Sequence, residues 1–427
     1  MAAGVWALRR FRLFWAGDTI SAAGSALSVV ALPLLVIETR HASDTFVGVL
    51  RAAQTLPFLL FAIPIGLLAD RVSRRRLLLA ADAVRLPLTA AVALAGVTLP
   101  LGGLVTLVFA IGLATMAHEV AYLSVVPELV AGPSQLPAAN RAVESSHAGA
   151  SLLGPAVGGA LVAALSAPAV IALDAVSFGI GATLTAINRG ERGSRRAAPP
   201  ASRERALTAG WGWLRRDRYV RPLTLYLAAN NVAAQAFQTA LLLFVVRTLG
   251  RGPAAAGLAV AATGCGFLLG ALVSPGAATR LGAGRVVIAA SLIGALGIGA
   301  VALSHGLPLV LLGSALAGAG SGLFNLHSIA IRQAITPPAL LGRVNAVVKT
   351  ISYGATTAGA FAGGLAAAAF GSRAVLAAAA LVSAAATGCL VTPAIRRLAG
   401  TPHPGGSPHP GGSPGPSDAE APGAAGR

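Results

Sequence analysis

The amino-acid sequence predicts an all-α membrane protein with twelve transmembrane helices in two pseudo-symmetric six-helix bundles. Three observations lead to this fold class. Of the 427 residues, 55% are hydrophobic and only 11% are charged, whereas soluble domains contain about a quarter charged residues. A bilayer-spanning helix needs about 20 apolar residues, and the chain contains twelve long apolar segments. Landmarks of the first half of the chain also recur in the second half, as two related bundles require.

The apolar segments give the expected positions of the helices. Runs of this length are typical of membrane helices, because the strands of a transmembrane barrel are shorter and alternate between apolar and polar residues. The twelve segments cover residues 13–37, 46–69, 77–97, 101–123, 138–163, 168–187, 222–247, 254–278, 284–303, 307–330, 341–370 and 374–395.

Short basic loops indicate how these segments are oriented. The turn between the second and third segments, from Gly66 to Arg76, contains four arginines and one carboxylate, Asp70. Arginine and lysine are retained on the cytoplasmic side of membranes. The loops that share a side with this turn are the more basic set. We therefore expect a multi-pass protein of the cell membrane with both termini in the cytoplasm.

One polar segment divides the chain. Residues 188–217 contain Pro199-Pro200 and many charges, and 206–217 could form a short amphipathic helix at the membrane surface. We therefore expect an N-terminal six-helix bundle at 1–187, a cytoplasmic linker with a short helix at 188–217 and a C-terminal six-helix bundle at 218–397. The tail, 398–427, is rich in Pro, Gly and Ser, and this composition predicts disorder.

The two halves share landmarks at a constant spacing. Asn140 and Asn345 each open a long apolar segment, and the pairs Gly158-Gly159 and Gly363-Gly364 follow them at the same offset of 205 positions. The basic turn also has a partner around Gly276, where Arg280 stands in the place of Asp70. A repeat of six spans predicts two bundles related by an axis normal to the membrane.

These motifs resemble those of the major facilitator superfamily over nearly the whole chain. The turn Gly66-x-x-x-Asp70-Arg71-x-x-Arg74-Arg75 is similar to the signature loop between the second and third spans of that superfamily, with Ser73 in place of its second glycine. The fifth segment contains Gly154-Pro155-x-x-Gly158-Gly159, which is similar to the core of the antiporter signature. The resemblance implies a transporter that works by alternating access, with a cavity between the two bundles.

Three further stretches resemble the bacterial drug and siderophore (enterobactin-type) exporters. They are residues 125–130, residues 210–217, and residues 332–337 together with 341–345. The basic motif that many proton-driven drug exporters carry on the fourth span is absent, because 101–123 contains no Arg or Lys. The resemblance to this branch implies outward transport of a small molecule.

Carboxylates inside the apolar segments are the candidates for coupling transport to an ion gradient, because a buried charge in a membrane is costly and is therefore a functional candidate. We favour Asp18 and Glu119. For Asp18 a structural pair with Arg12, or with another arginine at the cytoplasmic end of the helices, is an equal alternative. Asp82 and Arg85 are spaced to pair on one helix face, Glu144 is expected to pair with Arg141, and Asp174 is expected to have a packing role.

Polar residues in the later segments are candidates for lining a substrate cavity. Asn231, Gln235 and Gln238 recur at i, i+4 and i+7, which places them on one helix face. Tyr122 lies one turn from Glu119, and Asn325 and Tyr353 are further candidates. Amides within membranes also act simply as bonds between helices, and this alternative remains open for each of them.

The basic turn also suggests a gate. Asp70 ends the second segment, and the eleventh begins near Pro337-Pro338, where the helix dipole favours an anion. We therefore expect Asp70 to close toward the second bundle near Arg343 or Arg332. The expected gating residues are Gly66, Asp70, Arg71, Arg74, Arg75 and Arg343.

The sequence as a whole predicts a secondary transporter. We expect proton-coupled export of a small amphipathic molecule, such as a drug, secondary metabolite or siderophore, by a monomer in the lipid bilayer. An importer or facilitator of the same fold and a non-transporting receptor or sensor are the alternatives. The sequence shows no catalytic set, phosphate-binding loop, cofactor motif or metal motif, and we expect no enzyme activity and no nucleic-acid partner.

Overall fold

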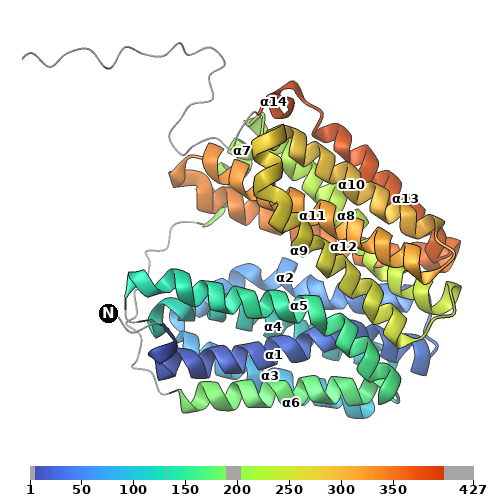
Figure 1. Ribbon diagram of the computed structural model, residues 1–427. Coiled ribbons are helices and arrows are strands. Elements are labelled where there is room, and N and C mark those ends of the chain that lie inside the picture. The colour runs from blue at the N-terminus through green and yellow to red at the C-terminus, as the bar shows by residue number, and fades with distance from the viewer. Residues whose placement is uncertain (1–4, 131, 189–202, 399–427) are drawn as a thin grey trace, which may run out of the picture.

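The computed structural model describes residues 5–130, 132–188 and 203–398, which form helices joined by short turns and contain no strand. In Figure 1 the first bundle lies below the second. The first bundle consists of α1 (Arg9–Leu34), α2 (Asp44–Arg71), α3 (Arg74–Ala95), α4 (Leu101–Leu129), α5 (Leu136–Ala164) and α6 (Ala167–Ile187).

The second bundle repeats this plan. It consists of α8 (Val220–Leu243), α9 (Pro253–Leu281), α10 (Ala283–Leu303), α11 (Leu307–Ile335), α12 (Pro338–Phe370) and α13 (Ser372–Ala386). In chain order α7 (Arg203–Arg216) connects the two bundles; it packs against α12 and α8 and covers most of the stretch for which the sequence predicts a short helix. Six short helices complete the described chain. They are η1 (Val5–Ala7), η2 (Leu35–Thr39), η3 (Pro133–Gln135), η4 (Phe244–Thr248), η5 (Thr387–Cys389) and α14 (Pro393–Arg396).

The pattern of helix packing is the same in both bundles. In the first, α1 packs against α5 and α6, α3 against α4 and α6, and α2 against α4. In the second, α8 packs against α12 and α13, α10 against α11 and α13, and α9 against α11. The first helix of each bundle also ends in a π-helical segment, η2 (Leu35–Thr39) and η4 (Phe244–Thr248). These equivalences confirm the two pseudo-symmetric six-helix bundles.

The helices are long and apolar enough to cross a membrane. Among the described residues, eleven helices satisfy both criteria. The twelfth helix of the pattern, α12, has 33 residues but is rich in Gly, Ala and Thr. This composition suits its position, because α12 packs between α8 of its own bundle and α2 of the other. Small residues allow such close helix contacts.

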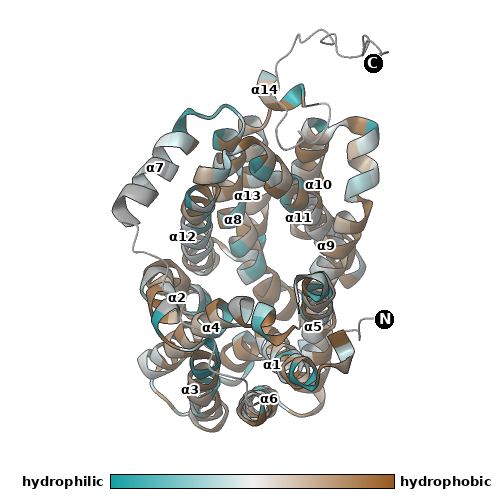
Figure 2. Cartoon of the chain, turned by 90° about the vertical axis from the view of Figure 1, so that its left-hand side faces the viewer, coloured by the Kyte–Doolittle hydropathy of each residue, from teal (hydrophilic) through white to brown (hydrophobic). Residues whose placement is uncertain are grey.

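Two helix pairs connect the bundles, α2 with α12 and α5 with α9. Figure 2 shows both pairs end-on. We call the side on which α1 begins and α6 ends the termini side, and the side on which α1 ends and α2 begins the opposite side. On the opposite side, Gly48 of α2 meets Gly364 of α12, and Gly159 of α5 meets Gly257 of α9. A Cβ on Gly48 or on Gly159 would lie 2.7 Å or 2.8 Å from the partner glycine's Cα.

The hydrophobic core follows the same asymmetry. On the opposite side one continuous cluster of buried residues includes both bundles, with Leu34 and Val47 from the first and Leu241 and Phe244 from the second. Toward the termini side the buried residues form separate clusters, one within the first bundle and others within the second bundle and between α7 and α12. The described chain is therefore joined across the bundles on the opposite side and divided on the termini side.

Candidate functional site

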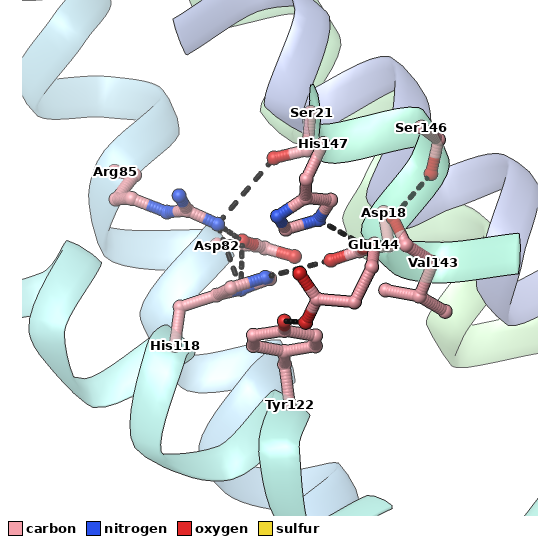
Figure 3. A network of polar contacts seen from close by, with 10 residues as sticks. All are labelled: Asp18, Ser21, Asp82, Arg85, His118, Tyr122, Val143, Glu144, Ser146 and His147. Atoms are coloured by element: carbon pink, nitrogen blue, oxygen red, sulfur yellow. Dashed lines mark hydrogen bonds and ion pairs between the residues drawn. The ribbon is translucent and has the colours of Figure 1, made fainter. Parts of the chain in front are cut away.

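A network of polar side chains lies inside the first bundle (Figure 3). Its centre is Asp18 of α1, which is only 6% exposed. One carboxylate oxygen of Asp18 lies 2.7 Å from His147 Nε2, on α5, and the other lies 3.4 Å from His118 Nε2, on α4. The two histidines thus connect Asp18 to two other helices. The alternative partner predicted for Asp18, Arg12, forms no ion pair with it in the described chain.

His118 continues the network toward α3. Its Nδ1 atom lies 3.0 Å from an oxygen of Asp82 and 2.7 Å from a guanidinium nitrogen of Arg85. A single ring nitrogen cannot accept a hydrogen bond from Arg85 and donate one to Asp82 at the same time. The protonation state of His118 therefore decides which of the two it binds. The predicted pair of Asp82 and Arg85 is present, and the Arg85 guanidinium also stacks on the ring of Phe178.

A second branch of the network begins at His147. Its ring stacks on that of Tyr122 at a centroid distance of 5.2 Å, and the Tyr122 hydroxyl donates a hydrogen bond of 3.3 Å to Glu144. The predicted pairing of Glu144 with Arg141 is wrong in the described structure, because Glu144 forms no ion pair with Arg141 there and accepts from Tyr122 instead. This branch is the more accessible part of the network: Glu144 is exposed and 32% of the His147 side chain is accessible, whereas Asp82 and Arg85 are at most 3% exposed.

The space beside this network is too small for an organic substrate. A cavity of about 10 Å³ lies among α1, α3, α4 and α6, with Asp18, Asp82 and His118 in its wall. About 10–15 Å³ is the room that one water molecule needs. The network therefore has space for a water or a proton, whereas a drug-sized molecule must bind elsewhere. Among the described residues, no three metal-ligating side chains converge on one point.

Glu119 differs from Asp18 in its surroundings. It is exposed and forms no hydrogen bond or ion pair with any described residue. The Tyr353 ring of α12 packs against Phe58 of α2 at 5.1 Å between centroids. The side chain of Glu119 is therefore outside the hydrogen-bonded network around Asp18.

The polar groups of the two bundles share one depth. Asp18, Arg85, His118, Glu119, His147 and Lys349 each lie about nine to eleven residues from the termini-side end of their helices, or roughly 14–17 Å at 1.5 Å per residue. This depth is near the middle of a hydrocarbon layer about 30 Å thick. Asn231 of α8 and Asn325 of α11 lie at the same depth, and Asn325 is exposed.

Two cationic residues were missed as candidates in the sequence. Lys349 is the only lysine of the chain, and it lies exposed within α12 without a described partner. Arg51 of α2 is 8% exposed, and its Nε has no hydrogen-bond partner among the described residues. Arg51 lies on the helix face that also carries Gly48 and Thr55, the face directed at α12. The available signal was a lone cation inside an apolar segment.

The amides of α8 are close to this interface. Gln238 has a fully buried side-chain oxygen without a partner in the described structure, whereas Asn231 and Gln235 are half-buried. Their helix packs against α12, where Val232 meets Gly359 and Ala236 meets Gly363. An unpaired buried oxygen is costly in a membrane helix. A ligand could remove this cost by donating a hydrogen bond to the Gln238 oxygen or, if the amide is flipped, by accepting one from its nitrogen.

The basic turn binds mainly within its own bundle. Arg74 forms an exposed ion pair with Glu128 of α4, and Arg75 donates to the carbonyls of Thr185 and Ala186 at the end of α6. Arg71 and Arg343 are exposed, and the backbone of Arg343 packs against Gly210 of α7. Gly66 lies within α2. The side chain of Asp70 lies outside the described part of the chain, so the predicted gate at Asp70 stays a prediction.

The antiporter-like motif on α5 serves two interfaces. Gly154 and Gly158 face α1, where added Cβ atoms would lie 2.3 Å from Ala26 Cβ and 2.8 Å from the Leu27 carbonyl. Pro155 and Gly159 face α9, because the Pro155 carbonyl and Gly159 both contact Gly257. The motif therefore joins the helix of Asp18 to the second bundle. Asp174 accepts a hydrogen bond of 2.5 Å from Ser28 of α1, which is a contact between helices of one bundle.

Comparison with known proteins identifies the family. Residues 4–400 match the MFS_3 family, described as transmembrane secretion effector. The multidrug efflux pump Tap of Mycobacterium tuberculosis is 31% identical over 175 residues, and this match covers 38% of the chain and only 40% of Tap.

Solved structures share the fold. The nucleoside transporter NupG superposes with a TM-score of 0.73 at 11% identity over 91% of this chain and 99% of NupG. A bacterial homologue of the iron transporter ferroportin superposes with a TM-score of 0.66 at 17% identity over 90% of this chain and 99% of that chain. With a family match over nearly its whole length and this fold, the chain belongs to the transmembrane secretion effector family of the major facilitator superfamily of membrane transporters.

Proposed function

We propose that this protein exports a small amphipathic molecule across the cell membrane in exchange for protons, by alternating access. The partial similarity to the multidrug efflux pump Tap supports the direction and the substrate class. The observation that carries the proposal is the position of Asp18 between His118 and His147, in a network that has room for protons but not for substrate.

The network is suited to respond to a proton. Histidine is the side chain that changes charge near neutral pH, and a proton would enter through the accessible branch of the network, from Glu144 and His147. Protonation of Asp18 removes the negative charge that holds His147 of α5 and His118 of α4 against α1. Since α5 also carries the Gly159 contact with α9, a shift of α5 relative to α1 changes the contact between bundles.

The contacts between bundles support the proposed alternation. They run from the ends on the opposite side, where Arg247 pairs with Asp44, to about the middle of the helices. There Thr55 of α2 bonds Thr357 of α12 at 3.0 Å. We propose that this conformation is closed on the extracellular side and open on the termini side, which would be cytoplasmic.

The proposed substrate path lies between α2 and α4 of the first bundle and α8, α11 and α12 of the second. Asn231, Gln235, Gln238 and Asn325 offer hydrogen bonds, Tyr122 and Tyr353 offer aromatic rings, and Glu119 and Lys349 offer opposite charges. Arg51 lies at the closed end of the path without a counter-ion. Since an unpaired buried cation is costly, we infer that the substrate presents an anionic or strongly accepting group to Arg51.

The test measures the direction and the driving force together. The purified protein is reconstituted in vesicles and supplied with fluorescent amphipathic dyes of positive, neutral and negative charge. We expect dye movement that an imposed proton gradient drives and a protonophore abolishes. Asp18→Asn should lose this dependence, whereas Asp174→Asn, the matched change at another buried carboxylate, should retain it. Equal gradient dependence in the wild type and Asp18→Asn would refute the coupling role, and dye movement along the proton flow would indicate import.

A further inference from the structure

A second cavity lies on the outer face of the second bundle at the termini side. Its volume is about 660 Å³, and it lies between the beginning of α10 and α14, which is at the top of Figure 1. Arg285, Arg396 and Arg397 contribute its charged wall, and Ile288, Leu292 and Pro393 contribute its apolar wall. It is far in the chain from the network around Asp18 and shares no residue with it.

The backbone around this cavity is firmly built. Gly284 lies so close to α14 that a Cβ at this position would be 1.8 Å from the Ile395 carbonyl oxygen. The amide of Gly284 donates a hydrogen bond of 3.2 Å to the Leu398 carbonyl, and Thr392 caps α14 by accepting from the Ile395 amide. Arg285 follows Gly284, and Arg396 follows Ile395. These contacts therefore hold arginines from two distant parts of the chain at one place.

The three arginines have no internal counter-ion in the described structure. All three are exposed, and none of their side chains forms a hydrogen bond or ion pair with another described residue. The sequence contains no Asp or Glu from residue 218 to residue 417, so the second bundle cannot supply one. Arginine binds phosphate oxygens through two parallel hydrogen bonds. The cluster thus fits a phosphate that comes from outside the chain.

The apolar wall indicates which kind of phosphate-bearing ligand fits the cavity. Arg285, Ile288 and Leu292 are spaced at i, i+3 and i+7, so they follow one face of α10 from its end toward the middle of the membrane. Leu292 is 45% exposed. A ligand that fills this cavity therefore has a charged head at the membrane surface and an apolar chain directed along α10.

We propose that this cavity binds an anionic phospholipid from the leaflet on the termini side. The phosphodiester is bound by Arg285, Arg396 and Arg397, and an acyl chain lies against Ile288 and Leu292. Basic pockets at the cytoplasmic ends of membrane helices are where anionic headgroups bind. The site is separate from transport and fixes the end of α10 against α14.

The experiment measures lipid binding directly. The full chain is embedded in nanodiscs of phosphatidylcholine, and the binding of a fluorescent phosphatidylglycerol is measured in competition with unlabelled phosphatidylglycerol, phosphatidylcholine, inorganic phosphate and glycerol 3-phosphate. The triple variant Arg285→Gln, Arg396→Gln, Arg397→Gln is compared with Arg9→Gln, Arg10→Gln, Arg12→Gln. This control removes the same charge from the termini side of the first bundle.

We expect phosphatidylglycerol to compete and the other three probes to fail. The triple variant should bind at least about tenfold more weakly, since each lost charge-assisted hydrogen bond costs roughly that factor, while the control variant binds as the wild type does. Equal competition by phosphatidylcholine, an unchanged triple variant or an equal loss in the control would overturn the proposal. Competition by inorganic phosphate or glycerol 3-phosphate would overturn the lipid as the ligand.

Should the triple variant fail to fold, Arg396→Gln alone, on the exposed short α14, should weaken phosphatidylglycerol binding severalfold, and wild-type binding would contradict the proposal.

Discussion

Asp18 and Asp174 are both buried carboxylates in membrane helices, yet their partners differ in kind. The Asp18 carboxylate contacts two histidines, which can gain or lose a proton, whereas the Asp174 carboxylate accepts from Ser28 and Ser177, which cannot ionise in this range. Burial alone therefore does not separate the two carboxylates. Their partners do, and the two histidines belong to helices that are far from α1 in the sequence.

The histidine that connects Asp18 to α5 gives a prediction at this scale. His147→Gln keeps a hydrogen-bond donor near Asp18 but cannot carry a charge. We expect it to retain fold and substrate binding and to lose most proton-driven transport. The loss should be about tenfold or more, because a hydrogen bond between charged groups contributes about 1.5–3 kcal/mol. Transport and dye binding are measured in the same vesicles, with His327→Gln as the control. His327 bonds only Ser274 within the second bundle. Unchanged gradient dependence in His147→Gln would contradict the prediction.

Arg51 gives a prediction with opposite signs for stability and transport. A buried guanidinium that lacks a partner destabilises the substrate-free protein. Arg51→Gln should therefore raise the unfolding free energy by about 1–3 kcal/mol, and the melting temperature should rise with it. It should also lower the affinity for anionic dyes more than for neutral ones. Arg373→Gln is the control, because Arg373 donates to the carbonyls of Ala302 and Ser304 and should destabilise instead. A lower melting temperature for Arg51→Gln would show that Arg51 is satisfied in the empty protein.

At the scale of helices, the glycines of α5 lie on two different faces of the helix, although Gly158 and Gly159 are adjacent in the sequence. Gly154 and Gly158 allow α1 to approach, and Gly159 allows α9 of the other bundle to approach. The equivalent glycines of α12, Gly359 and Gly363, face α8, while Gly364 faces α2. Each bundle thus uses the same helix both to pack internally and to meet its partner. A motif that resembles an antiporter signature is, in this structure, a connection between bundles.

Gly159→Val tests this connection. A Cβ at this position would lie 2.5 Å from the Pro253 carbonyl, so the closure on the opposite side should fail while the first bundle stays folded. We expect transport to fall to near background. We also expect a cysteine-reactive reagent that cannot cross membranes to enter between the bundles from the opposite side. Gly149→Val on the same helix is the control, because a Cβ there would meet no atom within 4 Å. Normal transport by Gly159→Val would show that the contact is dispensable.

At the scale of the whole molecule, the buried core is continuous across the bundles on one side only. Transport by alternating access requires this core to separate and the termini side to close. Burial of apolar surface contributes about 25 cal/mol per Å², so the proposed opening must be compensated by new contacts on the other side. Glu119 of α4 and Lys349 of α12 are exposed, carry opposite charges and lie at about the same depth in different bundles, so they are suited to form such a contact.

A reversible crosslink tests the movement. After Cys265→Ser and Cys389→Ser, cysteines at Asp44 and Arg247 are joined by a thiol-reactive crosslinker with a cleavable disulfide, because the ion pair there is made through the long Arg247 side chain and a direct disulfide needs Cα atoms within about 7 Å. Crosslinking should stop transport, and reduction should restore it. The control pair is Thr248→Cys with Ser372→Cys, whose hydroxyls lie 2.9 Å apart on the same side but within one bundle. Transport that continues with the Asp44–Arg247 crosslink formed would refute opening on this side.

The sequence determined by itself the twelve helices, their repeat and the pair of Asp82 and Arg85, because hydropathy, periodicity and i, i+3 spacing are local properties of the chain. It also indicated Asp18 and Glu119, since a carboxylate in an apolar run is conspicuous. Only the tertiary structure decided that Asp18 meets His118 and His147, that Glu144 meets Tyr122 rather than Arg141, and that Arg51 and Lys349 have no described partner. These facts depend on which helix faces come together, and packing between residues more than a hundred positions apart leaves no periodic signal in a single sequence.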